Sequence, residues 1–231
     1  MCNELGCPVG IEVFRGNTQD ATTVLPKIKQ IQQDYKVQEV IFVVDRGLVT
    51  QANAKKLEDV DGLHTISALT HRQIVKLLER QLIQPELFDQ KQIVQVYDPD
   101  QLNRRYCLCK NPNTAQKETQ TRQSLLGRTT EALNRIAQAK RRSKVERISA
   151  RVGKVLQKYK MGKFVVWEVK DGRLEWHWDE GAIAAEAVFD GCYIVTTDLP
   201  ESQMTKEDVV KSYKKLSLVE KAFRLLKTVW L

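Results

Sequence analysis

Apolar runs and helical periodicities alternate along the first third of the chain. Residues 9–14 alternate as a short strand does, and apolar positions three and four apart over residues 22–35 predict a helix. The continuous apolar run 40–44 ends abruptly at Asp45, which predicts a strand buried on both faces. The next predicted elements are a helix over 50–57 and a strand over 64–69. This alternation is typical of an α/β fold.

The pattern changes in the middle of the chain. A helix is predicted over residues 70–81, followed by short strands over 93–97 and 105–110. Helices come next, and Gly162 is well placed to end them. Two alternating segments then flank Asp171 and Gly172, a strong signal for a tight hairpin. Three of the four Trp residues lie in these segments, over 164–169 and 173–178, where strand packing is favoured over base stacking.

The last part of the chain predicts one more strand and two helices. The strand covers residues 192–197, and Thr205 caps the helix that follows. An amphipathic helix is predicted over 213–230. Its polar face carries a stripe at seven-residue intervals, with Arg224 one turn from the middle member: Tyr213, Glu220 and Lys227.

Composition limits the possible classes of protein. The chain has 231 residues, 42% of them apolar and 29% charged, which is enough to build a packed core. Its longest apolar run is five residues, at 40–44, so neither a membrane span nor a secretory leader is expected, and a cytoplasmic location is predicted. The five cysteines are scattered and predict reduced thiols.

The net charge of +8 is concentrated in one segment. Residues 110–163 carry fifteen basic and three acidic side chains, so this segment is +12 and the remainder is −4. Within it one helical face repeats basic residues, at Arg147, Arg151, Lys154 and Lys158. A solvated charged face is one interpretation. The concentration favours the other, a surface that attracts nucleic-acid phosphates.

Two separated carboxylates suggest chemistry on those phosphates. Asp45 follows a buried strand, and Glu220 lies on a later helix beyond the basic segment. An exposed Glu beside Arg and Lys is commonly a surface ion pair. Placed with Asp45, however, Glu220 fits a divalent-metal site for phosphoryl transfer, because Mg²⁺ prefers a few carboxylates with water and substrate phosphate. Tyr213 and Lys227 could then hold phosphates.

Five blocks of sequence resemble the DDE transposases of insertion sequences, most closely the insertion sequence four group. The blocks are collinear over nearly the whole chain and cover residues 10–23, 43–51, 151–164, 190–196 and 213–227. The resemblance implies an RNase H-like mixed-sheet core interrupted by a strand-containing insertion with long basic helices. The expected division is a first core part at 1–69, the insertion at 70–189, and a second core part at 190–231.

The resemblance also implies a reaction and its residues. Asp45 corresponds to the family's second catalytic Asp and Glu220 to its Glu, which together hold Mg²⁺ or Mn²⁺ during DNA cleavage and strand transfer at transposon ends and target. Tyr213 and Lys227 match family residues that contact DNA phosphates. Leu216 stands where the family signature has Arg, and Arg224 is the candidate substitute.

One catalytic carboxylate has no counterpart, since the family's first Asp lies on a strand before residues 9–14. We therefore expect a transposase fragment, truncated at both ends and inactive alone, that associates with the nucleoid when bound to DNA. A full-length transposase or a second copy is a candidate partner. The alternatives are a non-catalytic DNA-binding remnant acting through residues 110–163, a protein without a partner, and an unrelated metal-dependent hydrolase with Asp190 or Asp198 as a third ligand.

Overall fold

The computed structural model describes Val13, Arg15, residues 20–46, Leu57, and residues 60–89, 92–139 and 141–229. The strand expected over 9–14 and most of the helix expected over 50–57 lie outside these residues. The chain divides into two compact units. The first contains residues 1–109 and 193–231, and the second is Lys110–Cys192. The second unit therefore begins 40 residues later along the chain than the expected insertion over 70–189, and ends three residues later.

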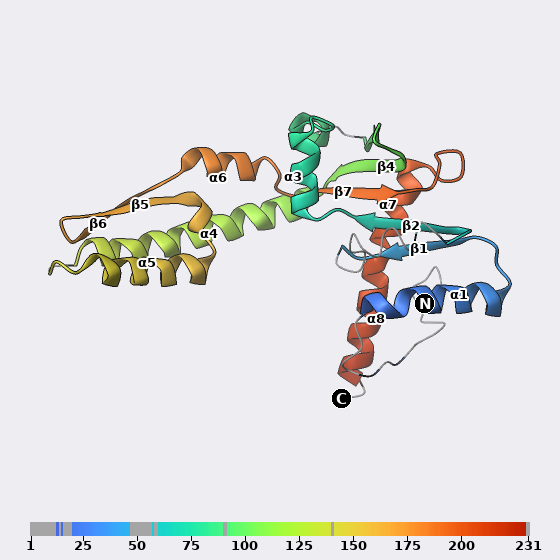
Figure 1. Ribbon diagram of the computed structural model, residues 1–231, viewed down its shortest axis with the longest axis horizontal. Helices are drawn as coiled ribbons and strands as arrows, with labels where there is room; N and C mark the ends of the chain where they lie inside the picture. The colour runs from blue at the N-terminus through green and yellow to red at the C-terminus, as the bar shows by residue number, and fades with distance from the viewer. Residues whose placement is uncertain are drawn as a thin grey trace. The chain divides into compact units, whose positions relative to one another are not determined.

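A five-stranded mixed sheet forms the first unit, in the order β1-β2-β7-β4-β3 (Figure 1). β1 (Val40–Val44) runs parallel to β2 (Leu63–Ala68), which is antiparallel to β7 (Cys192–Thr197). β3 (Val94–Asp98) and β4 (Gln101–Lys110) form an antiparallel hairpin at one edge. The strands expected at 40–44, 64–69, 93–97, 105–110 and 192–197 are confirmed, as is the α/β class. The sequence placed β3 and β4 in the insertion, whereas the structure adds them to this sheet.

Helices lie on both faces of the sheet. Side chains alternate along β1, so Phe42 packs with Ile28 of α1 (Asp20–Tyr35), and Val43 faces the cluster that contains Val209 of α7 (Lys206–Lys214). As predicted, Thr205 caps α7 by accepting a hydrogen bond from the backbone N–H of Asp208. The remaining elements are α3 (His71–Glu79), the short helix η1 (Pro85–Asp89) and α8 (Leu216–Val229).

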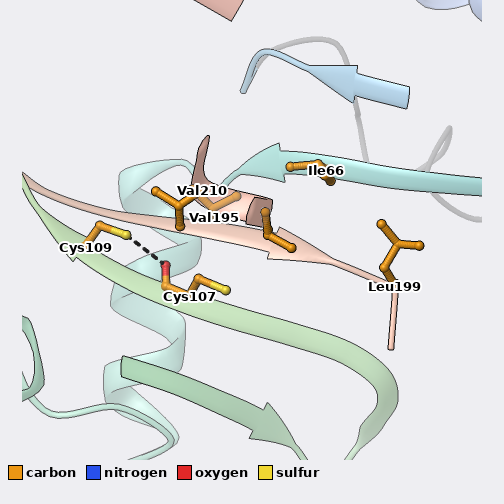
Figure 2. Packing of buried hydrophobic residues seen from close by; sticks show 7 residues of the cluster. Ile66, Cys107, Cys109, Val195, Leu199 and Val210 are labelled. Atoms are coloured by element: carbon orange, nitrogen blue, oxygen red, sulfur yellow. Dashed lines mark hydrogen bonds between the residues drawn. The ribbon is translucent and has the colours of Figure 1, made fainter. Parts of the chain in front are cut away.

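The core between the sheet and α7 is shown in Figure 2. Cys107 and Cys109 are two residues apart on β4 and point into the same cluster, beside Val195 of β7. Both are free thiols, and burial raises the pKa of the Cys107 thiol to about 12. These two cysteines are reduced, as the sequence predicted, and they pack in the core.

β1 is less buried than its apolar sequence suggested. Phe42 and Val43 pack on opposite faces and Val44 is buried, but Ile41 is 42% exposed, so the expected burial on both faces is only partly met. The reason lies in the strand order. β1 is a terminal strand of the sheet that the described residues form, and a strand at an edge has fewer neighbours to cover it.

The second unit packs two helices against a hairpin. α4 (Pro112–Ala137) and α5 (Val145–Tyr159) contact one another and the strands β5 (Val165–Lys170) and β6 (Arg173–Trp178). Asp171 and Gly172 both have positive φ, 49° and 70°, which confirms the predicted tight turn. The hairpin's Trp residues pack against the helices, and the indole N–H groups of Trp176 and Trp178 donate to Asn134 and Thr130. The short helix η2 (Gly162–Phe164) and α6 (Glu180–Ala187) flank the hairpin.

Two helix ends differ from the expectation. α5 ends in a left-handed residue at Lys160 (φ 56°), and Gly162 instead begins η2. The single helix expected over 213–230 is broken, because α7 ends at Lys214 and α8 begins at Leu216. At the break the N–H of Lys215 is shared between the carbonyls of Lys211 and Ser212. Tyr213 and Glu220 therefore lie on different helices.

Replacing Gly191 by Ala tests the close approach of its backbone to that of Asn111. A Cβ at this position, where φ is +72°, would lie 2.3 Å from the carbonyl oxygen of Asn111, so we expect a loss of about 2 kcal/mol or more in unfolding free energy. Gly153 is the matched control. Its Cβ would meet nothing within 4 Å, so Gly153→Ala should gain about 0.5–1 kcal/mol. Urea denaturation measures both, and equal effects would contradict this account.

Candidate functional site

Asp45 occupies the position at which open α/β sheets present their ligand-binding groups. It directly follows β1, and its side chain is exposed. One carboxylate oxygen, Oδ1, accepts a hydrogen bond of 2.7 Å from the backbone N–H of Arg46. Because β1 and β2 are parallel, with Val44 opposite Ser67, Asp45 lies at the sheet edge where β2 also ends.

Glu220 is exposed on α8, in the same compact unit as Asp45. α8 follows α7 directly, and α7 packs against both β1 and β2. Arg224 lies one turn beyond Glu220 and is also exposed. Lys227 belongs to α8, but its side chain lies outside the described residues.

The single helix expected to carry Tyr213, Glu220 and Lys227 is divided at Lys215. Tyr213 lies on α7, before the break at Lys215, and is half-buried against the core cluster of the first unit. Seven-residue spacing places side chains on one face only while the helix is unbroken. No Pro or Gly marks the break, so the sequence carried no signal for it.

The described residues do not form a complete metal site. Among them, no three His, Cys, Asp or Glu side chains gather closely enough to hold an ion. Asp198, one proposed third ligand, lies at the opposite end of β2 from Asp45. There its Oδ1 accepts from the N–H of Thr65 at 2.6 Å, and its Oδ2 is 2.8 Å from Nδ1 of His64. Neither Asp45 nor Glu220 therefore belongs to a cluster of three such side chains in the part of the chain that is described.

Asp190, the other proposed third ligand, is held by Arg122. The guanidinium donates to both carboxylate oxygens, at 2.7 Å to Oδ1, and Thr119 donates its hydroxyl to Oδ2 at 2.7 Å. Both charged side chains are only 12% exposed, and the Arg122 guanidinium lowers the pKa of Asp190. This ion pair joins residues 68 positions apart, so no local pattern could reveal it.

The basic stripe of α5 is confirmed as an exposed face. Ile148 and Val152 are buried, whereas the four predicted residues are exposed: Arg147, Arg151, Lys154 and Lys158. Within the described ranges none of these four forms an ion pair. Other members of the basic segment are neutralised locally, because acidic side chains bind Arg122, Arg135 and Lys163. The basic side chains without a carboxylate partner are therefore fewer than the fifteen counted in the sequence of this segment.

A mixed sheet with helices on both faces, and a carboxylate at the end of a strand, is consistent with an RNase H-like enzyme of nucleic acids. The family model of the transposase DDE domain matches residues 1–231, so the chain belongs to that family. No curated protein and no solved structure matches the chain. The family acts on DNA and generally uses divalent metal ions.

Among the described helices, none pairs the length of a membrane span with the apolar character that a span needs.

Replacing Asp190 by Asn tests the buried ion pair. Arg122 would keep its charge but lose its carboxylate, so we expect the unfolding free energy to fall by about 3 kcal/mol at neutral pH. Arg122 lowers the folded-state pKa of Asp190, so the pair's contribution is present above the unfolded Asp pKa and is lost as pH falls through the folded value. The difference between wild type and variant should therefore shrink in acid.

Asp179→Asn is the control, because Asn can still accept the N–H of Ala182 as the cap of α6 and should cost little. Urea denaturation across the acid range measures both variants. If the difference in unfolding free energy between wild type and Asp190→Asn stays constant with pH, the ion pair of Asp190 with Arg122 is contradicted.

Proposed function

We propose that the chain is the DDE domain of a transposase of the insertion sequence four group, a family whose reaction is DNA cleavage and strand transfer at transposon ends. The observation that carries this proposal is the exposed carboxylate of Asp45 at the end of β1, in the unit that also contains Glu220. We assign these two residues as the catalytic carboxylates. A chain with this role would work in the cytoplasm, on nucleoid DNA.

Asp45 and Glu220 are the proposed ligands of Mg²⁺ or Mn²⁺. Bound ions of this kind activate an attacking oxygen and stabilise a leaving one. Arg224, Lys227 and Tyr213 are the proposed contacts to DNA phosphates, with Arg224 in place of the Arg that the family has at the position of Leu216. The hydroxyl is the polar group of the Tyr213 side chain, so it is the group proposed to make this contact.

The 231-residue chain by itself is proposed not to cut DNA. Asp45 and Glu220 match two of the family's three catalytic carboxylates, and the described residues contain no cluster of three His, Cys, Asp or Glu side chains that could hold an ion. A cation held by two carboxylates is bound less tightly and is oriented less well than one held by three.

Incubation with supercoiled plasmid in Mg²⁺ or Mn²⁺ tests this proposal, with nicked and linear products measured on gels. We expect wild type, Asp45→Ala and Glu220→Ala to give the same background. Robust cutting by wild type that disappears in both variants would overturn the proposed inactivity and would support the two assignments. Cutting that persists in both variants would overturn the assignments.

A second candidate function is DNA binding without catalysis, with a full-length transposase or a second copy as the partner. The exposed stripe of α5 favours this function. Its four cations lie on one side of the helix and are exposed to solvent, and among the described residues none has a carboxylate partner. Such a surface binds the phosphate backbone by releasing condensed counterions. Binding should therefore weaken steeply with salt and should not need a metal ion.

Neutralising the stripe tests this function. With Arg147, Arg151, Lys154 and Lys158 all changed to Gln, the slope of log K against log salt for duplex DNA should become shallower by about 3.6, or roughly 0.9 per phosphate contact. The control removes the same charge from exposed positions of the first unit: Lys29, Arg72, Lys76 and Lys211. Fluorescence anisotropy between about 50 and 200 mM salt measures both. Equal changes in slope for the stripe variant and the control would show that DNA binding depends only on net charge, and would contradict a binding surface localised on α5.

A further inference from the structure

The turn of the β5–β6 hairpin lies against the connection between α4 and α5. The N–H of Ser143 donates to the carbonyl of Gly172 at 3.2 Å. The fit is close, since a Cβ at Gly172 would lie 3.1 Å from the carbonyl oxygen of Ser143 and 3.2 Å from Cβ of Arg142. Figure 1 shows the hairpin turn and the helix connection at the same end of the second unit.

This contact gathers basic side chains that are separated in the sequence. Arg173 begins β6, immediately after the turn, while the connection supplies three more cations before α5 starts. We call this group the basic tip, and all its members are exposed: Arg141, Arg142, Lys144 and Arg173. Arg147, in the first turn of α5, is the nearest member of the stripe along the chain.

The charges at the basic tip are free to act on a ligand. Lys170 and Arg173 are opposite one another across the hairpin, but Glu168 and Glu175 bind Lys170. In the described residues no carboxylate forms an ion pair with a member of the basic tip. Asp171 in the turn and Glu146 in the first turn of α5 are the acidic side chains nearby in sequence, so positive charge predominates.

We propose that the basic tip is a second DNA-backbone contact, continuous with the stripe of α5. This inference rests on the proposed DNA-binding function. The stripe from Arg147 to Lys158 extends about 16 Å along the helix at 1.5 Å per residue, and the tip lengthens it beyond the start of α5. The amino-terminal end of α5 adds partial positive charge at the junction. Arg142 and Arg173 present guanidinium groups, which suit bidentate binding of phosphate oxygens.

The experiment compares two double variants that remove equal charge from the second unit. Arg142→Gln with Arg173→Gln removes two cations of the basic tip. Lys163→Gln with Lys170→Gln removes two cations that carboxylates already bind. The probe is a labelled duplex of random sequence, and anisotropy gives log K against log salt. The tip variant should make the slope shallower by about 1.8, and the control by close to zero.

Urea denaturation identifies folding defects, and both double variants should keep the wild-type midpoint. If the tip variant unfolds early, Arg173→Gln alone replaces it, with an expected change in slope of about 0.9. An unchanged slope in the tip variant, while the stripe variant loses its contacts, would overturn this inference and leave the proposed DNA binding standing. Equal changes in tip variant and control would also overturn it. Failure of wild type to bind DNA would overturn the proposed DNA binding itself.

Discussion

The second unit depends on how the chain enters and leaves it. Its two ends meet where the N–H of Asn111 donates to the carbonyl of Gly191 at 2.9 Å, an approach that leaves no space for a Cβ. Beside this contact Arg122 binds Asp190 through both carboxylate oxygens, and Glu118 accepts the N–H of Gly191 at 2.7 Å. Removing one partner of a buried ion pair destabilises the fold, because the other charge is left buried and unpaired. These contacts fix the N-terminal part of α4 to the segment that leads into β7.

This arrangement separates two kinds of chemistry. The first unit carries Asp45 and Glu220, and the second carries the exposed cations gathered on α5 and at the basic tip. Arg122, Arg135 and Lys163 each have a carboxylate partner in the folded chain. What remains exposed on α5 and at the basic tip is a narrower surface than the sequence count suggested. Charge concentration in a sequence therefore indicates the partner, and the fold determines which residues can reach it.

Local patterns predicted the elements well, because each depends on neighbouring residues. The apolar run of β1, the turn at Asp171 and Gly172 and the amphipathic face of α5 were all predicted from short segments. Non-local features were missed. The placement of β3 and β4 in the main sheet and the pair of Arg122 with Asp190 arise from contacts distant in sequence. The break at Lys215 has no Pro or Gly to mark it, so periodicity alone extended the helix through it.

The aromatic side chains of the hairpin bear on how the proposed surface of the second unit would bind DNA. Trp167, Trp176 and Trp178 are half-buried against its core, and the indole N–H groups of the last two donate to Asn134 and Thr130. These contacts favour a packing role for the rings over base stacking. The exposed groups on the stripe and the tip are cations, which bind phosphates and fix position without reading sequence. The proposed surface therefore provides affinity and register, and recognition of a particular transposon end requires residues other than these.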